Sequence, residues 1–187
     1  MAKWLVKTEP SECGIDDFAR QPEGVIPWDG VRNYQARNFL AQMQEGDLVF
    51  IYHSSCKRIG IAGIVRVVKS AYPDPSQFNP ESPYYDPKST AEKPRWQAVD
   101  LQFERKLPAL IPLDSLKAMP ELSELALVRR GSRLSVMPVS DPQHFLAIGF
   151  IAAGLPPEVG LLQRRHQEFD GPGAVHLVPY DLFDLLR

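Results

Sequence analysis

The sequence predicts an α+β fold, a mixed β-barrel with peripheral helices, and two observations indicate it. Short runs of apolar and β-branched residues alternate along the chain with segments whose apolar residues have helical spacing. In addition, the apolar run 48–52 and the β-branched run 59–68 flank the basic turn Lys57–Arg58, which predicts a hairpin. Hydrophobic residues make up 44 % of the 187 residues, which is enough for a buried core.

The elements expected before residue 70 follow from apolar periodicity and from capping residues. Ser11 is a potential cap for a short helix, and Asn33 is a potential cap for a longer one whose apolar residues share one face. The expected order is a strand at 3–8, a helix through Ile15, Phe18 and Ala19, a loop at 21–29, a helix from Asn33 to about Gln44, and strands at 48–52 and 59–68.

The second half of the chain begins with a long segment, residues 71–94, that is rich in Pro, Ser, Asp and Tyr. A structureless loop of this length is uncommon in a compact domain and is often functional. The elements expected after it are a strand at 95–103, short helical pieces within 112–127, an extended segment at 134–139, a helix from Asp141 to Ala152, a strand at 174–178 and a helix at 180–187.

The stretch Gly154-Leu155-Pro156-Pro157 is expected to end the helix that begins at Asp141. We therefore divide the chain into a domain, residues 1–153, and a C-terminal extension, residues 154–187. The extension either packs on the barrel or mediates contacts with a second copy, as a homodimer, or with a protein partner.

Composition argues against several classes of function. The net charge of −2 gives no overall basic footprint, so any nucleic-acid contact must come from local patches. Cys13 and Cys56 are too few for a disulfide framework, and without a signal sequence they predict a cytoplasmic protein. The longest apolar stretch, around 145–155, is interrupted by glycine and too short to span a bilayer, so no membrane role is expected.

Aromatic and polar side chains in loops and at the expected ends of elements suggest a nucleobase site. Trp28, Tyr34 and Trp96 offer faces for stacking, and polar edge contacts are available from Asn33, His53, Ser54 and Ser55. Structural roles remain open: Trp96 heads a strand and also fits a core, and capping alone explains Asn33. Three basic groups fit phosphate contacts, although such charges are often only solvated: Arg32 and Arg37; Lys57 and Arg58; Arg129, Arg130 and Arg133.

Separated motifs also give the chain a family resemblance. They are Trp4-Leu5-Val6-Lys7-Thr8-Glu9-Pro10, Trp28-Asp29-Gly30-Val31-Arg32-Asn33-Tyr34-Gln35-Ala36-Arg37, Tyr52-His53-Ser54-Ser55, Arg95-Trp96-Gln97-Ala98-Val99-Asp100 and Arg133-Leu134-Ser135-Val136. From about Lys3 to about Phe150 the chain resembles an EVE domain, a PUA-like β-barrel module similar to the thymocyte nuclear protein family and its small bacterial relatives.

The resemblance implies a concave pocket for a single modified nucleobase, either flipped out of a duplex or free. The residues that it implies, motif by motif, are Trp28, Asn33, Tyr34, His53 and Ser54 in the pocket, Lys7, Thr8 and Glu9 at the floor, and Arg133, Leu134 and Ser135 along the rim.

We therefore expect a non-enzymatic reader that holds a modified base of DNA or RNA, for example a methylated or hydroxymethylated one, in an aromatic pocket without a cofactor. The alternatives are an RNA- or DNA-processing hydrolase on a PUA-like scaffold and a protein-interaction adaptor that acts through the extension. His53 and Cys56 are not expected to be catalytic, because neighbouring loop positions seldom direct two side chains at each other. Together with Cys13 they supply too few ligands for zinc, so no metal is expected.

Overall fold

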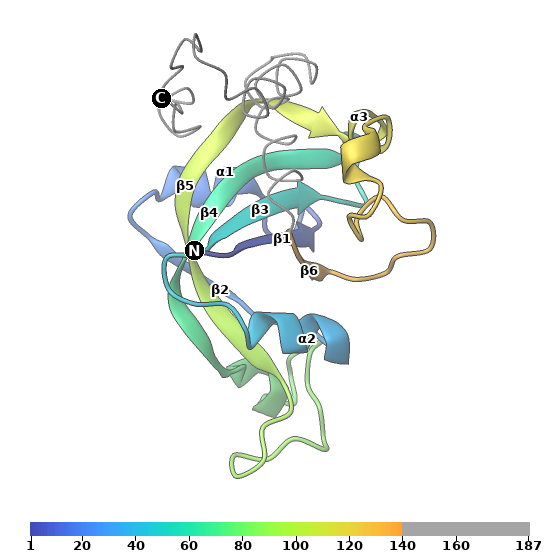
Figure 1. The fold of residues 1–187 in the computed structure, drawn as a ribbon. Coiled ribbons are helices and arrows are strands. Elements are labelled where there is room, and N and C mark those ends of the chain that lie inside the picture. The colour runs from blue at the N-terminus through green and yellow to red at the C-terminus, as the bar shows by residue number, and fades with distance from the viewer. Residues whose placement is uncertain (140–187) are drawn as a thin grey trace, which may run out of the picture.

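A computed structural model describes residues 1–139 of the chain, and these residues form an α+β fold (Figure 1). The strands are β1 (Lys3–Thr8), β2 (Val25–Trp28), β3 (Leu48–His53), β4 (Gly60–Pro73), β5 (Gln97–Pro112) and β6 (Val136–Pro138). The helices are α1 (Ile15–Arg20), α2 (Tyr34–Leu40) and α3 (Leu113–Lys117), with the 3-10 helices η1 (Pro75–Phe78) and η2 (Pro120–Leu122). Within residues 1–139, no helix is long and apolar enough to cross a membrane. The helices and strand predicted after residue 140 lie outside the described residues.

The strands form one six-stranded sheet in the order β2-β5-β4-β3-β1-β6. β1 runs parallel to β3, because α1, β2 and α2 lie between them in the chain and bring it back in the same direction. The other pairs are antiparallel, and the pairing of β3 with β4 confirms the predicted hairpin. Thr8 and His53 are the last residues of β1 and β3, and they are paired with each other. The two strands therefore end side by side.

The sheet is not closed into a barrel. β2 and β6 are its two edges, and no pairing joins them within residues 1–139. Instead α2 contacts both β5 and β6, and Figure 1 shows this helix in the opening between the two ends of the sheet. The prediction of a mixed α+β fold is confirmed, whereas the predicted β-barrel is not confirmed, because the sheet is open within residues 1–139. A helix covers the opening that a further strand pair would have closed.

The helix predicted after Asn33 is confirmed at its start. The Asn33 Oδ1 atom accepts a hydrogen bond from the backbone N–H of Ala36 at 3.0 Å, so the residue is an N-cap. The helix ends at Leu40 rather than near Gln44, and turns then bring Met43 into the core. The short helix α1 is capped at Gly14 rather than at Ser11, and the Asp17 carboxylate accepts from the Gly14 N–H at 2.7 Å.

β2 lies where the sequence predicted a loop. Its residues pair with Val99–Gln102 of β5, and Pro27 is tolerated because β2 is an edge strand. β4 and β5 are both longer than predicted, and their pairing register shifts at several points. Such irregularities bend a strand pair. The long ends of β4 and β5 therefore curve down beside α2, as Figure 1 shows.

The core lies on both faces of the sheet. Along β1, Trp4 and Val6 face one cluster with Phe18 of α1, whereas Leu5 faces a second cluster with Leu116 of α3. This alternation is the ordinary two-residue period of a strand. At the far end of β1 from Thr8, the Val139 N–H donates to the Lys3 carbonyl at 2.8 Å. The two ends of the described chain are therefore adjacent.

Candidate functional site

A pocket of about 790 Å³ opens where β1 ends and the segment after β2 leads into α2. Its volume lies in the range typical of small-molecule sites, about 300–1,000 Å³. The lining residues come from five segments of the chain: Lys7, Thr8, Glu9, Glu12, Cys13; Ile26, Pro27, Trp28, Asp29, Gly30, Val31, Arg32, Asn33; Ser54; Pro83, Tyr84; and Arg133, Leu134, Ser135.

Two aromatic side chains line this pocket, Trp28 and Tyr84. Trp28 is 8 % exposed and belongs to the core, so its position is fixed by packing. Tyr84 lies against Gly30, which has a φ of +71°. A Cβ atom on Gly30 would come within 2.8 Å of the Tyr84 ring. Glycine is therefore required here both for the left-handed turn and for the close approach of the ring.

The floor of the pocket is built by hydrogen bonds between strand ends. The Lys7 N–H donates to the Ser135 carbonyl at 2.8 Å, and the Ser54 N–H donates to the Thr8 carbonyl at 2.7 Å. The Thr8 hydroxyl donates to the Cys13 carbonyl at 2.7 Å, and the Ser54 hydroxyl donates to the Thr8 carbonyl at 3.1 Å. Since both hydroxyl protons are used internally, the oxygen atoms of Thr8 and Ser54 are left as acceptors for a ligand.

The pocket contains charges of both signs. Lys7 and Arg133 are basic, and Glu9, Glu12 and Asp29 are acidic. Desolvation lowers the pKa of Lys7. Desolvation also raises the pKa of Asp29, and the nearby Asp74 carboxylate raises it further. Burial in this pocket therefore disfavours the charged form of both side chains.

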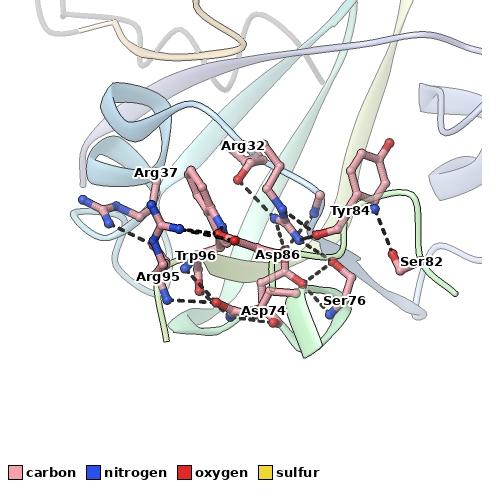
Figure 2. Close-up of polar contacts among 12 residues, drawn as sticks. Arg32, Arg37, Asp74, Ser76, Ser82, Tyr84, Asp86, Arg95 and Trp96 are labelled. Atoms are coloured by element: carbon pink, nitrogen blue, oxygen red, sulfur yellow. Dashed lines mark hydrogen bonds and ion pairs between the residues drawn. The ribbon is translucent and has the colours of Figure 1, made fainter. Parts of the chain in front are cut away.

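Arg32 holds the pocket wall together (Figure 2). Its Nη1 donates to the Asp74 carboxylate at 2.7 Å and to the Val31 carbonyl at 3.2 Å. Its Nε donates to the Tyr84 carbonyl at 2.7 Å, and its Nη2 donates to the same carbonyl and to the Ser76 hydroxyl. These contacts use all the N–H donors of a guanidinium. Arg32 lines the pocket, but its donors are occupied by protein, so phosphate binding would require it to give up existing bonds.

Tyr34 and Trp96 lie outside the pocket lining and form a second aromatic pair. Their ring centroids are 4.9 Å apart with an angle of 27° between the planes. Trp96 is 5 % exposed, and its indole N–H donates to Asp86 at 2.7 Å. Figure 2 shows Trp96 next to Asp86, its hydrogen-bond acceptor. The sequence grouped these two aromatic residues with Trp28, whereas the structure separates them into another cluster.

His53 also lies outside the lining and supports α1. Its Nε2 atom accepts from the Ile15 N–H at 3.2 Å, so this nitrogen carries no proton. Desolvation lowers the pKa of His53, which agrees with a neutral ring. The Cys56 thiol donates to the Arg58 carbonyl at 3.1 Å. Within residues 1–139 no three His, Cys, Asp or Glu side chains are placed to hold a metal ion.

The basic groups are dispersed. Arg133 is exposed and lines the pocket, together with Arg32. Arg37 lies on α2 and donates to Asn38 and to the Arg95 carbonyl. The other predicted phosphate contacts are exposed and lie outside the lining: Lys57, Arg58, Arg129, which pairs with Glu124, and Arg130.

Of the predicted pocket residues, the lining contains Lys7, Thr8, Trp28, Asn33, Ser54, Leu134 and Ser135, and the predicted floor residue Glu9 joins them. Sequence reasoning missed Tyr84 and Asp29 as lining residues. The only signal for Tyr84 was its place in the long Pro- and Tyr-rich segment, which did not distinguish it from Tyr85. Asp29 stood inside a recognised motif but was not assigned to the pocket.

The fold and the pocket define a small α+β protein with a cavity lined by Trp28 and Tyr84 near the ends of β1 and β3. The model of the EVE domain family matches residues 2–148, and the chain belongs to this family. Human thymocyte nuclear protein 1 is 43 % identical over an alignment of 157 residues, and the match covers 75 % of this chain and 69 % of the relative.

Solved structures of relatives have the same fold. A protein from Pseudomonas putida is 50 % identical with a TM-score of 0.78, and the match covers 81 % of this chain and 99 % of that one. The human THYN1 protein in complex with 5-methylcytosine-containing DNA is 40 % identical with a TM-score of 0.74. That match covers 82 % of this chain and 96 % of the human one.

Proposed function

We propose that this protein is a non-enzymatic reader that binds a modified nucleobase of DNA or RNA in the pocket between Trp28 and Tyr84. One observation carries the proposal: a pocket of about 790 Å³ combines two aromatic residues with polar groups at strand ends. A planar base needs an aromatic face for stacking and polar groups for its edge. The complex of the human relative with 5-methylcytosine-containing DNA supports a modified cytosine in DNA as the first ligand to test.

The pocket offers distinct groups for the edge of a base. Thr8 and Ser54 present acceptor oxygens, because their hydroxyl protons are committed to backbone carbonyls. The Asn33 Oδ1 atom caps α2, which leaves the Nδ2 donors of this exposed amide available. Arg133 is exposed at the pocket and supplies positive charge for a phosphate next to the bound base.

The protonation of Cys13 and the hydrogen bonding of His53 support a binding protein that does not catalyse a reaction. Burial raises the pKa of the Cys13 thiol to about 11, so the thiol is neutral at physiological pH and a poor nucleophile. His53 uses its unprotonated nitrogen to accept from the Ile15 N–H, so it is not free to act as a base. The acidic side chains Glu9, Glu12 and Asp29 also lie in the pocket, and a hydrolase is the rival that the experiment must exclude.

The test is a binding titration with matched tyrosine variants. Affinity is measured at one fixed salt concentration for single-stranded oligonucleotides that differ only in one central cytosine, unmodified, methylated or hydroxymethylated. We expect a preference for one modified form, which Tyr84→Leu reduces and which Tyr85→Leu leaves unchanged, because Tyr85 lies outside the lining. Mass spectrometry of the recovered oligonucleotide is expected to show no product. Equal binding of all three forms, or conversion of any of them, would reject the proposal.

A further inference from the structure

Tyr34 is half exposed and yet held in place. Its side chain is on the first residue of α2 and is 49 % exposed. Its ring stacks on Trp96, which is itself buried and held by a hydrogen bond to Asp86. The Tyr34 hydroxyl also accepts from the Arg95 guanidinium. An exposed aromatic ring with a fixed orientation loses little conformational entropy when a flat ligand stacks on it.

We propose that Tyr34, backed by Trp96, is a second base-stacking site that takes the unmodified nucleobase next to the one held in the pocket. This inference rests on the proposed reader function. It assigns a role to the two aromatic residues that the pocket does not use, and it commits to an unpaired nucleotide of the same strand as the occupant.

The position of Arg32 indicates that the two sites are neighbours. Its guanidinium lies 5.6 Å from the Tyr84 ring centroid and 5.4 Å from the Trp96 ring centroid. One aromatic residue of the pocket and one of the second pair therefore share a single arginine. In addition, Asn33 lines the pocket, and Tyr34 follows it directly. Adjacent nucleotides of one strand fit sites that are this close together.

The charge around Tyr34 suits a phosphate linkage. The Arg37 guanidinium lies 5.0 Å from the Tyr34 ring centroid, and that of Arg95 lies 5.6 Å away. Arg95 is paired with Asp86, at 2.9 Å. Arg37 instead donates to the Asn38 side chain and to the Arg95 carbonyl, which are neutral, and no ion pair involves it within the described residues. Among residues 1–139 its guanidinium therefore has no carboxylate partner beside the ring, which suits a phosphate contact.

The experiment removes the neighbouring bases and keeps the phosphates. Two single-stranded DNA pentamers carry a central 5-methylcytosine, one with thymidine flanks and the other with abasic flanks. Wild type is expected to bind the abasic-flanked strand about 5- to 150-fold more weakly, the range for one lost base stack. Tyr34→Leu is expected to bind both strands with the same weak affinity. Tyr34→Phe keeps the ring and should behave as wild type, and Tyr85→Leu is the control for an exposed tyrosine, 42 % exposed.

Equal affinity of wild type for both strands, or equal losses in Tyr34→Leu and Tyr85→Leu, would overturn the second site. Failure of the reader function would look different. Titrations are repeated with the same strands carrying a central unmodified cytosine, which gives the preference for the modified base. This preference depends on the pocket, whereas the effect of the flanking bases depends on Tyr34. Loss of that preference with an intact flank effect would reject the reader and retain the stacking site.

Discussion

Arg32 and Asp74 form an ion pair at 2.7 Å in which the Asp74 side chain has no exposed surface and the Arg32 side chain is 22 % exposed. The carboxylate also accepts from the Gly30 N–H at 3.0 Å. The pair therefore anchors the Trp-Asp-Gly turn to the start of η1, and through the Tyr84 carbonyl it also anchors the pocket wall.

Replacing Arg32 by methionine is expected to destabilise the protein by about 3 kcal/mol, because it leaves a buried carboxylate without its partner. Urea unfolding at pH 7 measures this change. Arg20→Met is the matched control: Arg20 pairs with Asp17 at 2.8 Å, but its side chain is 74 % exposed. Loss of such a surface pair should change stability by no more than about 0.5 kcal/mol. Similar effects of the two substitutions would show that the Arg32 pair is not a buried anchor.

The Arg32 contribution should depend on pH. Burial acts to raise the pKa of Asp74, but hydrogen bonds from Ser76 and Arg32 outweigh it and lower the pKa below its ordinary value of 3.8. A carboxyl with a lowered folded-state pKa contributes stability above its unfolded pKa and loses it as the pH falls through the folded value. The difference between wild type and Arg32→Met should therefore be full at neutral pH and shrink in acid, below about pH 4. A difference that grows in acid would contradict this.

Gly30→Ala is expected to cost both stability and ligand affinity. The substitution strains a residue with φ of +71° and drives its Cβ into the Tyr84 ring. Gly46→Ala is a close control, because Gly46 has φ of +89° but nothing within 4 Å of its Cβ position. Both variants should lose about 1–2 kcal/mol from the left-handed backbone alone. Only Gly30→Ala should lose more than this and also bind the modified oligonucleotide more weakly; equal behaviour would mean that the Tyr84 contact is unimportant.

Asn33 is expected to have separable structural and ligand-binding roles. Asn33→Ala should lower stability by about 1 kcal/mol through loss of the cap on α2. Asn33→Asp should restore stability, since its carboxylate can cap the helix, but it lacks the amide donors that face a ligand. We expect this variant to melt like wild type and to bind the modified base less well. Full binding by Asn33→Asp would reduce Asn33 to a cap.

The rate at which the Cys13 thiol is alkylated is expected to depend on whether a ligand occupies the pocket. In a Cys56→Ser background it is the single cysteine, and its thiol has a pKa raised to about 11 by burial, with contributions from Asp17 and Asp29. Alkylation by iodoacetamide should therefore be slow at pH 7 and accelerate as the pH approaches about 11, because only the thiolate reacts. Saturating modified oligonucleotide should slow the reaction further, and an unmodified strand at the same concentration should not. Rapid alkylation at pH 7 would contradict the burial of this thiol.

Local signals predicted a large part of the fold. The Asn33 cap, the β3–β4 hairpin and the first strand depend on residues that are close in sequence, and all are present. β2 was not predicted because it is short and contains Pro27, which is unusual in a strand. Its partner, β5, also lies far along the chain. The predicted β-barrel is not confirmed, for a similar reason. Whether the two edge strands meet depends on how α2 packs between the ends of the sheet. Local sequence patterns do not predict this packing.

In the candidate site, too, the residues in contiguous motifs were predicted, and those placed by long-range contacts were not. Motifs identified the residues contributed by β1 and by the turn after β2, because these are contiguous in the chain. Tyr84 reaches the pocket only through contacts with Gly30 and with Arg32, which is 52 residues away in sequence. The division of the aromatic residues into two clusters likewise depends on where Trp96 packs. Such long-range contacts determine which of several plausible aromatic side chains share one cavity.

The hydrogen bond between Val139 and Lys3 brings the start and the end of the described chain together at one end of β1, and the pocket opens at the other end, beyond Thr8. A strand of six residues separates these ends by about 15–20 Å, at roughly 3.3 Å per residue. A fluorescent label attached near Met1 would therefore sit at the far end of β1 from the pocket and leave its entrance clear for a ligand.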